Sequence, residues 1–264
     1  MYEVVTPVRF IRTMQSGRTR PFLIECEKKD GDLIELVVKC SKKAQEGALN
    51  LAFEAIAGSL AQDLTLPVPD FFLVKLHKDF IDTISCKSTR SIFDHSDIYA
   101  FGSQHLNGYR IWAKDERVPI NLRRLATQIF VFDVVTINPD RRPENPNCLT
   151  TGSKANTKLA IIDHELCFYK FISWLPPWES SGFDFYAHPC KHIFGKPYNK
   201  APQDLEAFVR RWKQLGEERI KEYFSGLPGS WSIEKERLEQ TFELLLESKA
   251  NIRQITQNAL KVLS

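Results

Sequence analysis

The order of strand-like and helix-like segments restricts the fold more than any other feature of the sequence. Segments rich in β-branched and aromatic residues, which are typical of strands, cover residues 4–11, 22–27, 33–40 and 71–76. One helical pattern, with apolar residues three or four positions apart, interrupts them at residues 49–64. Beyond residue 122 the patterns are mostly helical. Strands with one helix, followed by helices, predict an α+β protein with two lobes.

The helix predicted to begin at Leu122 is apolar on nearly every side, which is typical of a buried helix. Pro139 ends this pattern after Asn138, because proline cannot continue a helix. A polar loop follows as far as Asn147, and a short apolar strand is predicted at residues 159–162. The loop and the end of that strand carry the residues that bear most directly on function.

Composition and charge exclude several classes of protein. The 264 residues are 43% hydrophobic, enough for a sizeable core, and 36 basic against 33 acidic side chains give a net charge of +3. So small a surplus argues against a protein built to coat nucleic acid. No run approaches the roughly 18–20 apolar residues of a membrane span, and the N-terminus does not resemble a signal peptide. The six cysteines form no CxxC pair and are expected to be reduced, so we expect a cytoplasmic protein.

Two segments carry the residue types that phosphoryl transfer from a nucleotide requires. Asp140 and Asn145 lie five residues apart in the polar loop, and Asp163 follows the predicted strand 23 residues beyond Asp140. In this reaction one carboxylate orients the attacking hydroxyl and accepts its proton. An amide oxygen and a second carboxylate are hard ligands of the kind that magnesium prefers. The spacing therefore makes Asp140 a candidate base, and Asn145 with Asp163 a candidate magnesium site.

The first third of the chain offers matching parts. Lys39 lies within an apolar predicted strand, where a lone lysine needs an explanation, and Glu54 lies on the helix that follows. A kinase uses such a pair to hold the lysine against the nucleotide phosphates. Residues 14–20 join the first two strands and include small and polar residues, whose backbone N–H groups are candidates to bind phosphate.

These residues and their surroundings resemble the HipA-like kinases, which are bacterial relatives of the protein-kinase and phosphatidylinositol-kinase folds. The resemblance covers most of the chain and is carried by two motifs, Asp133-x4-Asn138-Pro139-Asp140-Arg141-Arg142-Pro143-Glu144-Asn145-Pro146-Asn147 and Ile162-Asp163-His164-Glu165. It implies a two-lobed protein-kinase-like fold. Residues 1–104 would form a small antiparallel β N-lobe with one helix, and residues 105–264 a larger, mostly helical C-lobe.

The resemblance also implies an activity and its site. The chain would transfer the γ-phosphate of ATP, with Mg²⁺, to a hydroxyl, and a serine or threonine of a protein is the first choice of acceptor. The implied site residues are Asp140 as catalytic base, Asn145 and Asp163 as metal ligands, and Lys39, paired with Glu54, as the contact to the phosphates. The implied nucleotide contacts are Ser16, Gly17, Arg18, Thr19 and, within a hinge at residues 99–103, Phe101. Some members of the family are toxins, which adds an antitoxin or another operon partner to the expected partners.

The chain departs from eukaryotic protein kinases, and other functions stay open on the residues alone. Gly17 is the one glycine of the phosphate loop, and His164-Glu165 follow Asp163 in place of Phe-Gly. Lipid kinases share the Asp-x4-Asn spacing, so a lipid or small-molecule kinase is one alternative. A nucleotide-binding pseudokinase or interaction module is another. The third is a helical adaptor in which these residues are structural.

Several other segments have readings outside the reaction. Arg141 and Arg142 are candidates to bind a substrate phosphate or to pair with nearby acids, and Asp133 is expected to be a paired structural carboxylate. Residues 188–192 have the spacing of metal ligands but lack a fourth ligand, so chance explains them better than zinc does. The aromatic loop at residues 174–178 would shape a substrate groove or pack against the helical lobe.

Overall fold

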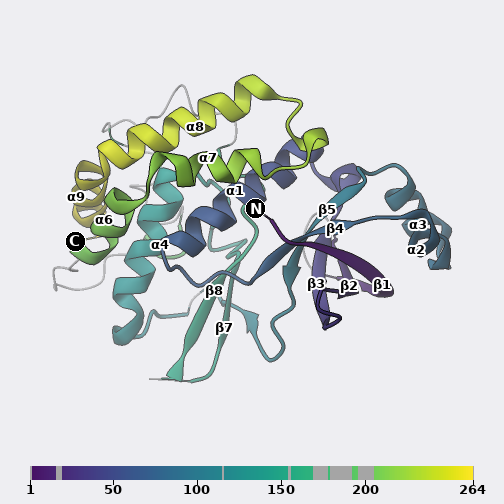
Figure 1. Ribbon diagram of the computed structural model, residues 1–264. Helices are drawn as coiled ribbons and strands as arrows, with labels where there is room; N and C mark the ends of the chain where they lie inside the picture. The colour runs from purple at the N-terminus through teal and green to yellow at the C-terminus, as the bar shows by residue number, and fades with distance from the viewer. Residues whose placement is uncertain are drawn as a thin grey trace. The chain divides into compact units, whose positions relative to one another are not determined.

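The computed structural model describes residues 2–15, 20–114, 116–153, 156–168, 178, 192–195 and 205–263. They form a mixture of helices and strands (Figure 1), which confirms the predicted α+β class. The chain divides into two compact units. Unit 1 comprises residues 1–56, 69–107 and 223–235, and unit 2 comprises residues 57–68, 108–222 and 236–264.

Unit 1 is built on a closed five-stranded barrel. Its strands are β1 (Val4–Thr13), β2 (Phe22–Glu27), β3 (Leu33–Lys39), β4 (Phe71–Lys75) and β5 (Tyr99–Gln104). They follow the order β1-β2-β3-β5-β4, and neighbours are antiparallel except for β1 with β4. This parallel pair, in which Val4 faces Leu73 and Val5 faces Val74, closes the barrel. Closure removes the exposed edges that an open sheet would present to other chains.

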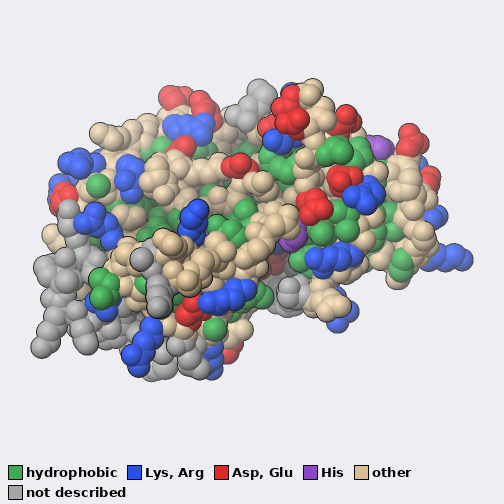
Figure 2. Space-filling view, turned by 90° about the horizontal axis from the view of Figure 1, so that it is seen from below, with side chains coloured by type: hydrophobic (Ala, Val, Ile, Leu, Met, Phe, Trp, Pro, Cys, Tyr) green, Lys and Arg blue, Asp and Glu red, His purple; other side chains and the backbone are tan. Residues whose placement is uncertain are grey.

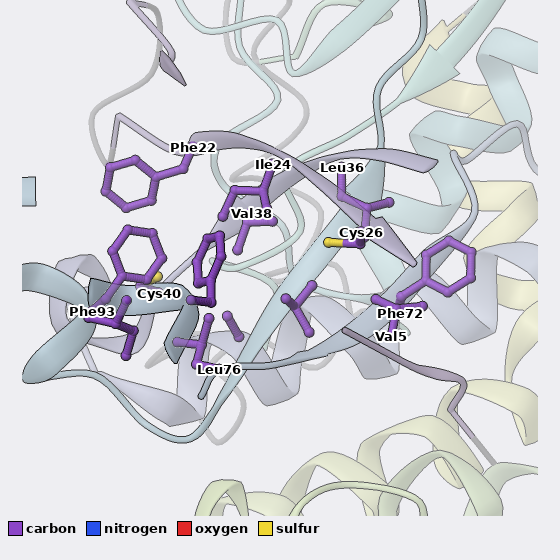
Figure 3. Close-up of a cluster of buried hydrophobic side chains, with 14 of the residues drawn as sticks. Val5, Phe22, Ile24, Cys26, Leu36, Val38, Cys40, Phe72, Leu76 and Phe93 are labelled. Carbon is purple, nitrogen blue, oxygen red and sulfur yellow. The ribbon is translucent and has the colours of Figure 1, made fainter. Parts of the chain in front are cut away.

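Alternate residues of the strands fill the barrel, because successive side chains of a strand point to opposite faces. β2 contributes Phe22, Ile24 and Cys26, and β3 contributes Leu36 and Val38 (Figure 3). All five are at most 1% exposed. The alternating apolar positions of the predicted strands therefore correspond to the inner face of this barrel.

Two short helices in unit 1 were not predicted from the sequence, α2 (Lys78–Thr83) and α3 (Lys87–Asp94). Each contributes one buried phenylalanine, Phe80 from α2 and Phe93 from α3. The Phe93 ring centroid lies 4.7 Å from that of Phe22 and 6.0 Å from that of Phe80. Both helices are too short and too polar to show a sustained helical period, so only packing against the barrel core identifies them.

Helix α1 (Ala48–Asp63) agrees closely with the helix predicted at residues 49–64, and residues 49–61 are all buried. The division between the units falls within this helix, after Ile56. The chain returns to unit 1 at residues 223–235. There the Tyr2 hydroxyl donates a hydrogen bond to the Tyr223 carbonyl at 2.7 Å, so segments more than 200 residues apart contribute to this unit.

Unit 2 contains the buried helix α4 (Arg123–Val135), in which every residue from Ala126 to Val135 is buried, as its all-round apolar pattern predicts. Unit 2 also contains a three-stranded antiparallel sheet, formed by β6 (Arg110–Ile111), which precedes α4, and by β7 (Cys148–Thr151) and β8 (Lys158–Ile161), which follow it. The later helices are α6 (Glu206–Gln214), α7 (Glu217–Ser225), α8 (Lys235–Ala250) and α9 (Ile252–Leu263). The loop at residues 136–147 connects α4 to β7, and β8 leads directly to Asp163.

None of the helices in the described ranges is both long enough and apolar enough to cross a membrane. Acidic and basic side chains are interspersed on the face shown in Figure 2. This mixture agrees with the small net charge of +3. We therefore expect the function to depend on a local arrangement of side chains rather than on a broad charged surface.

Candidate active site

Lys39 and Glu54 form a buried ion pair in unit 1. Lys39 Nζ lies 2.8 Å from Glu54 Oε2, and the two side chains are 11% and 4% exposed. Lys39 is the last residue of β3, and Glu54 lies in the first half of α1. Removing either partner would break a buried ion pair, a change that typically costs about 3–5 kcal/mol. The structure thus brings together two residues that the sequence proposed as a pair.

The 136–147 loop is tied to the end of α4 by Asn138. The Asn138 Nδ2 group donates to Asp133 Oδ1 at 2.8 Å, and its Oδ1 accepts from the Asp140 backbone N–H at 3.0 Å. Ile137, just before it, has a φ of +48°. That left-handed conformation is unfavourable for a β-branched residue and persists only where surrounding contacts hold the backbone. The start of the loop is therefore closely determined by its contacts.

Asp140 is held mainly through one of its two carboxylate oxygens. Oδ2 accepts from Asn145 Nδ2 at 2.7 Å and from Asn147 Nδ2 at 3.1 Å. Oδ1 lies 3.2 Å from Arg142 Nη2, and the Arg142 side chain is 51% exposed. Oδ1 is therefore the oxygen that an incoming hydroxyl can reach by displacing an exposed guanidinium, without breaking either amide contact.

The orientation of Asn145 follows from the carboxylate beside it. An ionised carboxylate only accepts hydrogen bonds, so the amide nitrogen of Asn145 must face Asp140, and its amide oxygen points away. The backbone supports this placement, because Arg142 and Asn145 exchange two N–H to carbonyl hydrogen bonds of 3.0 and 2.9 Å. The Asn145 oxygen is the atom with which this side chain can coordinate a cation.

Asp163 follows β8, and its approach to the loop is set by the backbone. The Ile162 N–H donates to the Asn147 carbonyl at 3.0 Å, and Asp163 itself has a φ of +61°. Burial, and after it the negative charge of Asp163, raises the pKa of Asp140, while contacts with Asn147 and Arg142 lower it. The two carboxylates therefore interact through space within unit 2.

The chemistry of these donors fits a magnesium ion. Asn145 and Asp163 supply an amide oxygen and a carboxylate, the hard ligands that Mg²⁺ prefers. The electrostatic effect of Asp163 on Asp140 is a second observation in favour, because a cation relieves the repulsion between two partly buried negative charges. The two residues thus have donor types that suit Mg²⁺, and their joint binding of the ion stays a prediction.

Arg141 does not bind a substrate phosphate, as one reading of the sequence allowed, because its side chain is fully buried. Its Nε donates to Asp133 Oδ2 at 2.6 Å and its Nη2 to Asp133 Oδ1 at 3.2 Å. Its Nη1 donates to the carbonyls of Asn147 and, at 3.3 Å, Ile162. Arg141 therefore ties the 136–147 loop to the chain just before Asp163. The expectation that Asp133 is a paired structural carboxylate agrees with this geometry.

Phe101 and its neighbours are residues of a strand of the barrel. Phe101 is 3% exposed, stacks on the Phe71 ring at 5.5 Å between centroids, and pairs in register with Lys39. Residues 99–103 belong to β5, whose backbone pairs with β3 on one side and β4 on the other, and the nucleotide-contacting hinge expected there stays a prediction. The chain leaves unit 1 only after residue 107, because these strand residues are part of its core.

Some expected site residues lie outside the part of the chain that the structure describes. They are Ser16, Gly17, Arg18, Thr19, the first four residues of the aromatic loop at 174–178, and residues 188–191. His192 is described, and both of its ring nitrogens contact protein groups, Asp133 Oδ2 and the Phe194 N–H. Hydrogen bonding within the protein therefore accounts for the one described member of the proposed zinc spacing.

Sequence reasoning gave two residues of this region no role in the network around Asp140. Asn147 donates to Asp140 from within the same loop, and the run of asparagines there was the signal that pointed to it. His192 contacts Asp133 across 59 positions of the chain, and no local pattern indicates that contact. A spacing rule identifies only residues that act within one segment, because contacts between distant segments depend on tertiary packing.

Comparison with solved structures places the fold among the kinases. The chain is similar to the crystal structure of a Helicobacter pylori proinflammatory kinase, CtkA, with a TM-score of 0.56 and 12% sequence identity. The match covers 99% of this chain and 98% of the other. No curated protein matches the sequence. At so low an identity this likeness shows a shared fold and nothing finer.

Comparison with protein families supplies the class. The sequence pattern of the family described as HipA-like kinase matches residues 8–260, which is nearly the whole chain. With the kinase fold and the acidic and amide side chains around Asp140, this match defines the protein as a kinase. The chain belongs to the HipA-like kinase family, as the resemblance of its motifs implied.

Proposed function

We propose that the chain is a two-lobed, ATP- and Mg²⁺-dependent protein kinase that transfers the γ-phosphate to a serine or threonine hydroxyl. Residues 1–104 would be the nucleotide-binding lobe and residues 105–264 the catalytic lobe. The observation that carries this proposal is the asymmetry of Asp140. Among the described residues, two amides hold its Oδ2, while its Oδ1 contacts the half-exposed Arg142. Membership of the HipA-like kinase family supports it.

In the proposed reaction Asp140 is the base. The acceptor hydroxyl donates a hydrogen bond to Oδ1, which orients its oxygen toward the γ-phosphorus of ATP. As the new O–P bond forms, the bond from that phosphorus to the bridging oxygen of ADP breaks, and the hydroxyl proton passes to Asp140. The raised pKa of Asp140, caused first by burial, favours its acting as a proton acceptor.

The remaining residues would bind and orient the nucleotide. Lys39, held by Glu54, would contact the phosphates, and Ser16, Gly17, Arg18 and Thr19 would offer backbone or side-chain donors to them. Asn145 and Asp163 would hold Mg²⁺, which when bound neutralises the charge of the phosphates. Phe101, buried beside β3, would support this region by packing.

The test compares the wild-type protein with Asp140→Asn, in Mg²⁺ and ATP labelled at the γ-phosphate. Label is measured on the protein itself, on casein and on vesicles that contain phosphatidylinositol. We expect label on protein serine or threonine, and at least a 100-fold loss in the variant, because a general base contributes roughly 10²–10⁴-fold. Transfer that persists in Asp140→Asn would contradict the role of Asp140.

The acceptors and a stability measurement separate the alternatives. Label on lipid alone would indicate a lipid kinase, and ATP-dependent thermal stabilisation without any transfer would indicate a pseudokinase. Absence of both would favour an adaptor. Lys39→Met serves as a second variant, since loss of the ammonium group proposed to contact the phosphates should weaken ATP-dependent stabilisation.

A further inference from the structure

Residues 192–195 attach to the interior of unit 2 through His192. His192 Nε2 lies 2.9 Å from Asp133 Oδ2, and its Nδ1 accepts from the Phe194 backbone N–H at 3.0 Å. Because Nδ1 accepts, it carries no proton, so Nε2 carries the proton and donates it to the carboxylate. The ring is therefore neutral and in a single tautomer. Burial of the ring, the largest influence, lowers the pKa of His192 and keeps it neutral.

The same short segment is bonded to the residue that follows the candidate base. The Ile193 N–H donates to the Arg141 carbonyl at 3.2 Å. Packing reinforces this contact, because the His192 ring lies edge-on to Phe130 at 5.0 Å and the Phe194 ring edge-on to Trp112 at 5.8 Å. Residues 192–194 thus fix the loop both through a backbone hydrogen bond and through a buried side chain.

Asp133 is the point at which these contacts meet. Its Oδ2 accepts from both Arg141 and His192, and its Oδ1 accepts from both Asn138 and Arg141. Asn138 and Arg141 lie on either side of Asp140. The orientation of the Asp133 carboxylate therefore determines the position of the backbone that presents Asp140, although Asp133 and His192 lie behind the loop and are fully buried.

We propose that His192 is a positioning residue for phosphoryl transfer, acting through Asp133 to hold Asp140 in its productive geometry. This inference rests on the proposed function, since it assigns His192 a part in that reaction. Without the Nε2–H bond, Asp133 loses one of the donors that fix its rotation about the Cβ–Cγ bond. Arg141 and Asn138 then lose a rigid acceptor, and an error of a fraction of an ångström at Asp140 is enough to slow catalysis.

Two amide substitutions separate the two hydrogen bonds of the ring. In His192→Gln the amide nitrogen reaches the position of Nε2 and can still donate to Asp133. In His192→Asn the shorter amide reaches only the position of Nδ1 and can accept from Phe194. His95→Gln is the matched control, because His95 is an exposed histidine that directly follows α3 in unit 1 and is bonded to Ser91.

The measurements are kcat and KM for Mg²⁺-ATP in self-labelling and ATP hydrolysis, together with thermal unfolding of each full-length variant. We expect a kcat about ten-fold to hundred-fold lower in His192→Asn, since a hydrogen bond to a buried charge is at stake. KM for ATP should be unchanged, and His192→Gln should recover most of the rate. His95→Gln should match the wild type.

Three outcomes would overturn the proposal. They are a His192→Asn variant with wild-type kcat, a loss shared equally by Gln and Asn, and a loss that appears only in KM. Thermal unfolding guards against a simple folding defect, because rates are compared at a temperature where each variant is folded. An inactive wild-type protein would instead contradict the proposed function, so the two failures are distinguishable.

Discussion

The two carboxylate oxygens of Asp140 have different hydrogen-bond partners, and this difference determines which oxygen is open to a substrate. Two asparagine amides hold Oδ2, whereas Oδ1 contacts Arg142, with no further partner in the part of the chain that the structure describes. The sequence reveals the residue types and the five-residue spacing between Asp140 and Asn145, but not this asymmetry. The asymmetry arises from the turn of the loop, in which Arg142 and Asn145 are joined by backbone hydrogen bonds.

Arg142 should influence the pH at which the protein is active. Its charge and hydrogen bond lower the pKa of Asp140, so Arg142→Ala should raise that pKa. Asp140 must be ionised to accept a proton, and the acid side of the rate profile should therefore move to higher pH. The measurement is the rate of label transfer against pH. Stability should change by less than about 0.5 kcal/mol, because the side chain is half exposed.

Arg142→Lys is the control for charge, and it should leave the profile closer to that of the wild type. A profile of Arg142→Ala that coincides with the wild-type profile would mean that another group sets the acid side. The direction of the shift, rather than its size, is the decisive result.

At the scale of elements, the long helices and strands and the short apolar strand β8 were predictable, whereas the short polar elements were not. α1 and α4 follow their apolar periodicity, and β2 has the bounds that its composition predicts. α2 and β6 are too short to produce a periodic pattern. Whether they form depends on the residues that α2 packs against and on the strand with which β6 pairs. The parallel contact of β1 with β4 likewise joins strands that are far apart in the chain.

Gly102 on β5 tests how tightly the barrel is packed. A Cβ atom at this position would lie 2.8 Å from Val74 Cγ2 and 3.0 Å from Leu36 Cδ1, both inside the barrel. Gly102→Ala should therefore lower the free energy of unfolding by about 1–3 kcal/mol, the usual cost of overpacking. Chemical denaturation of the full chain measures this change.

Gly229→Ala is the matched control in the same unit, because nothing lies within 4 Å of the added Cβ and its φ is not positive. It should unfold within about 0.5 kcal/mol of the wild type. Adding Val74→Ala to Gly102→Ala removes the nearest obstacle and tests the cause directly. Equal stability of Gly102→Ala and Gly229→Ala would show that the barrel yields without cost.

At the scale of the whole molecule, 12% identity to a kinase of known structure accompanies a fold matched over nearly the full length of both chains. Such conservation of fold without sequence requires that the pattern of buried positions be kept while individual residues change. In unit 2 the buried network of Asp133, Arg141 and His192 is polar, so its contribution to stability depends on protonation.

The stability of the protein should fall as the pH falls from 7 to 5. The pKa of His192 is lowered in the folded protein, chiefly by burial, so below about pH 6.5 the unfolded chain binds a proton that the folded chain does not. Stability therefore decreases with acid by up to about 1.4 kcal/mol per pH unit. Asp133, whose pKa is far below its usual range because of Arg141 and His192, adds to this loss only below about pH 4.

Two other titratable groups of unit 2 do not produce the same pH dependence. Arg141, the charged neighbour, stays protonated throughout. Asp140 has a raised pKa, so its contribution to stability changes with pH in the opposite direction, near pH 4 and above. Urea unfolding at several pH values should show the slope between pH 6.5 and 5 in the wild type and lose it in His192→Gln. The same slope in both proteins would assign it to another group.

The sequence by itself determined the α+β class, the long helices and strands, and the residues around Asp140, because periodicity and short spacings are local properties of a chain. It also carried the family resemblance that the family comparison confirms. Only the tertiary structure decided that Arg141 is buried, that His192 bonds to Asp133, and that β1 closes the barrel. These features depend on contacts between residues far apart in the chain, and burial acts on whole packed units rather than on single segments.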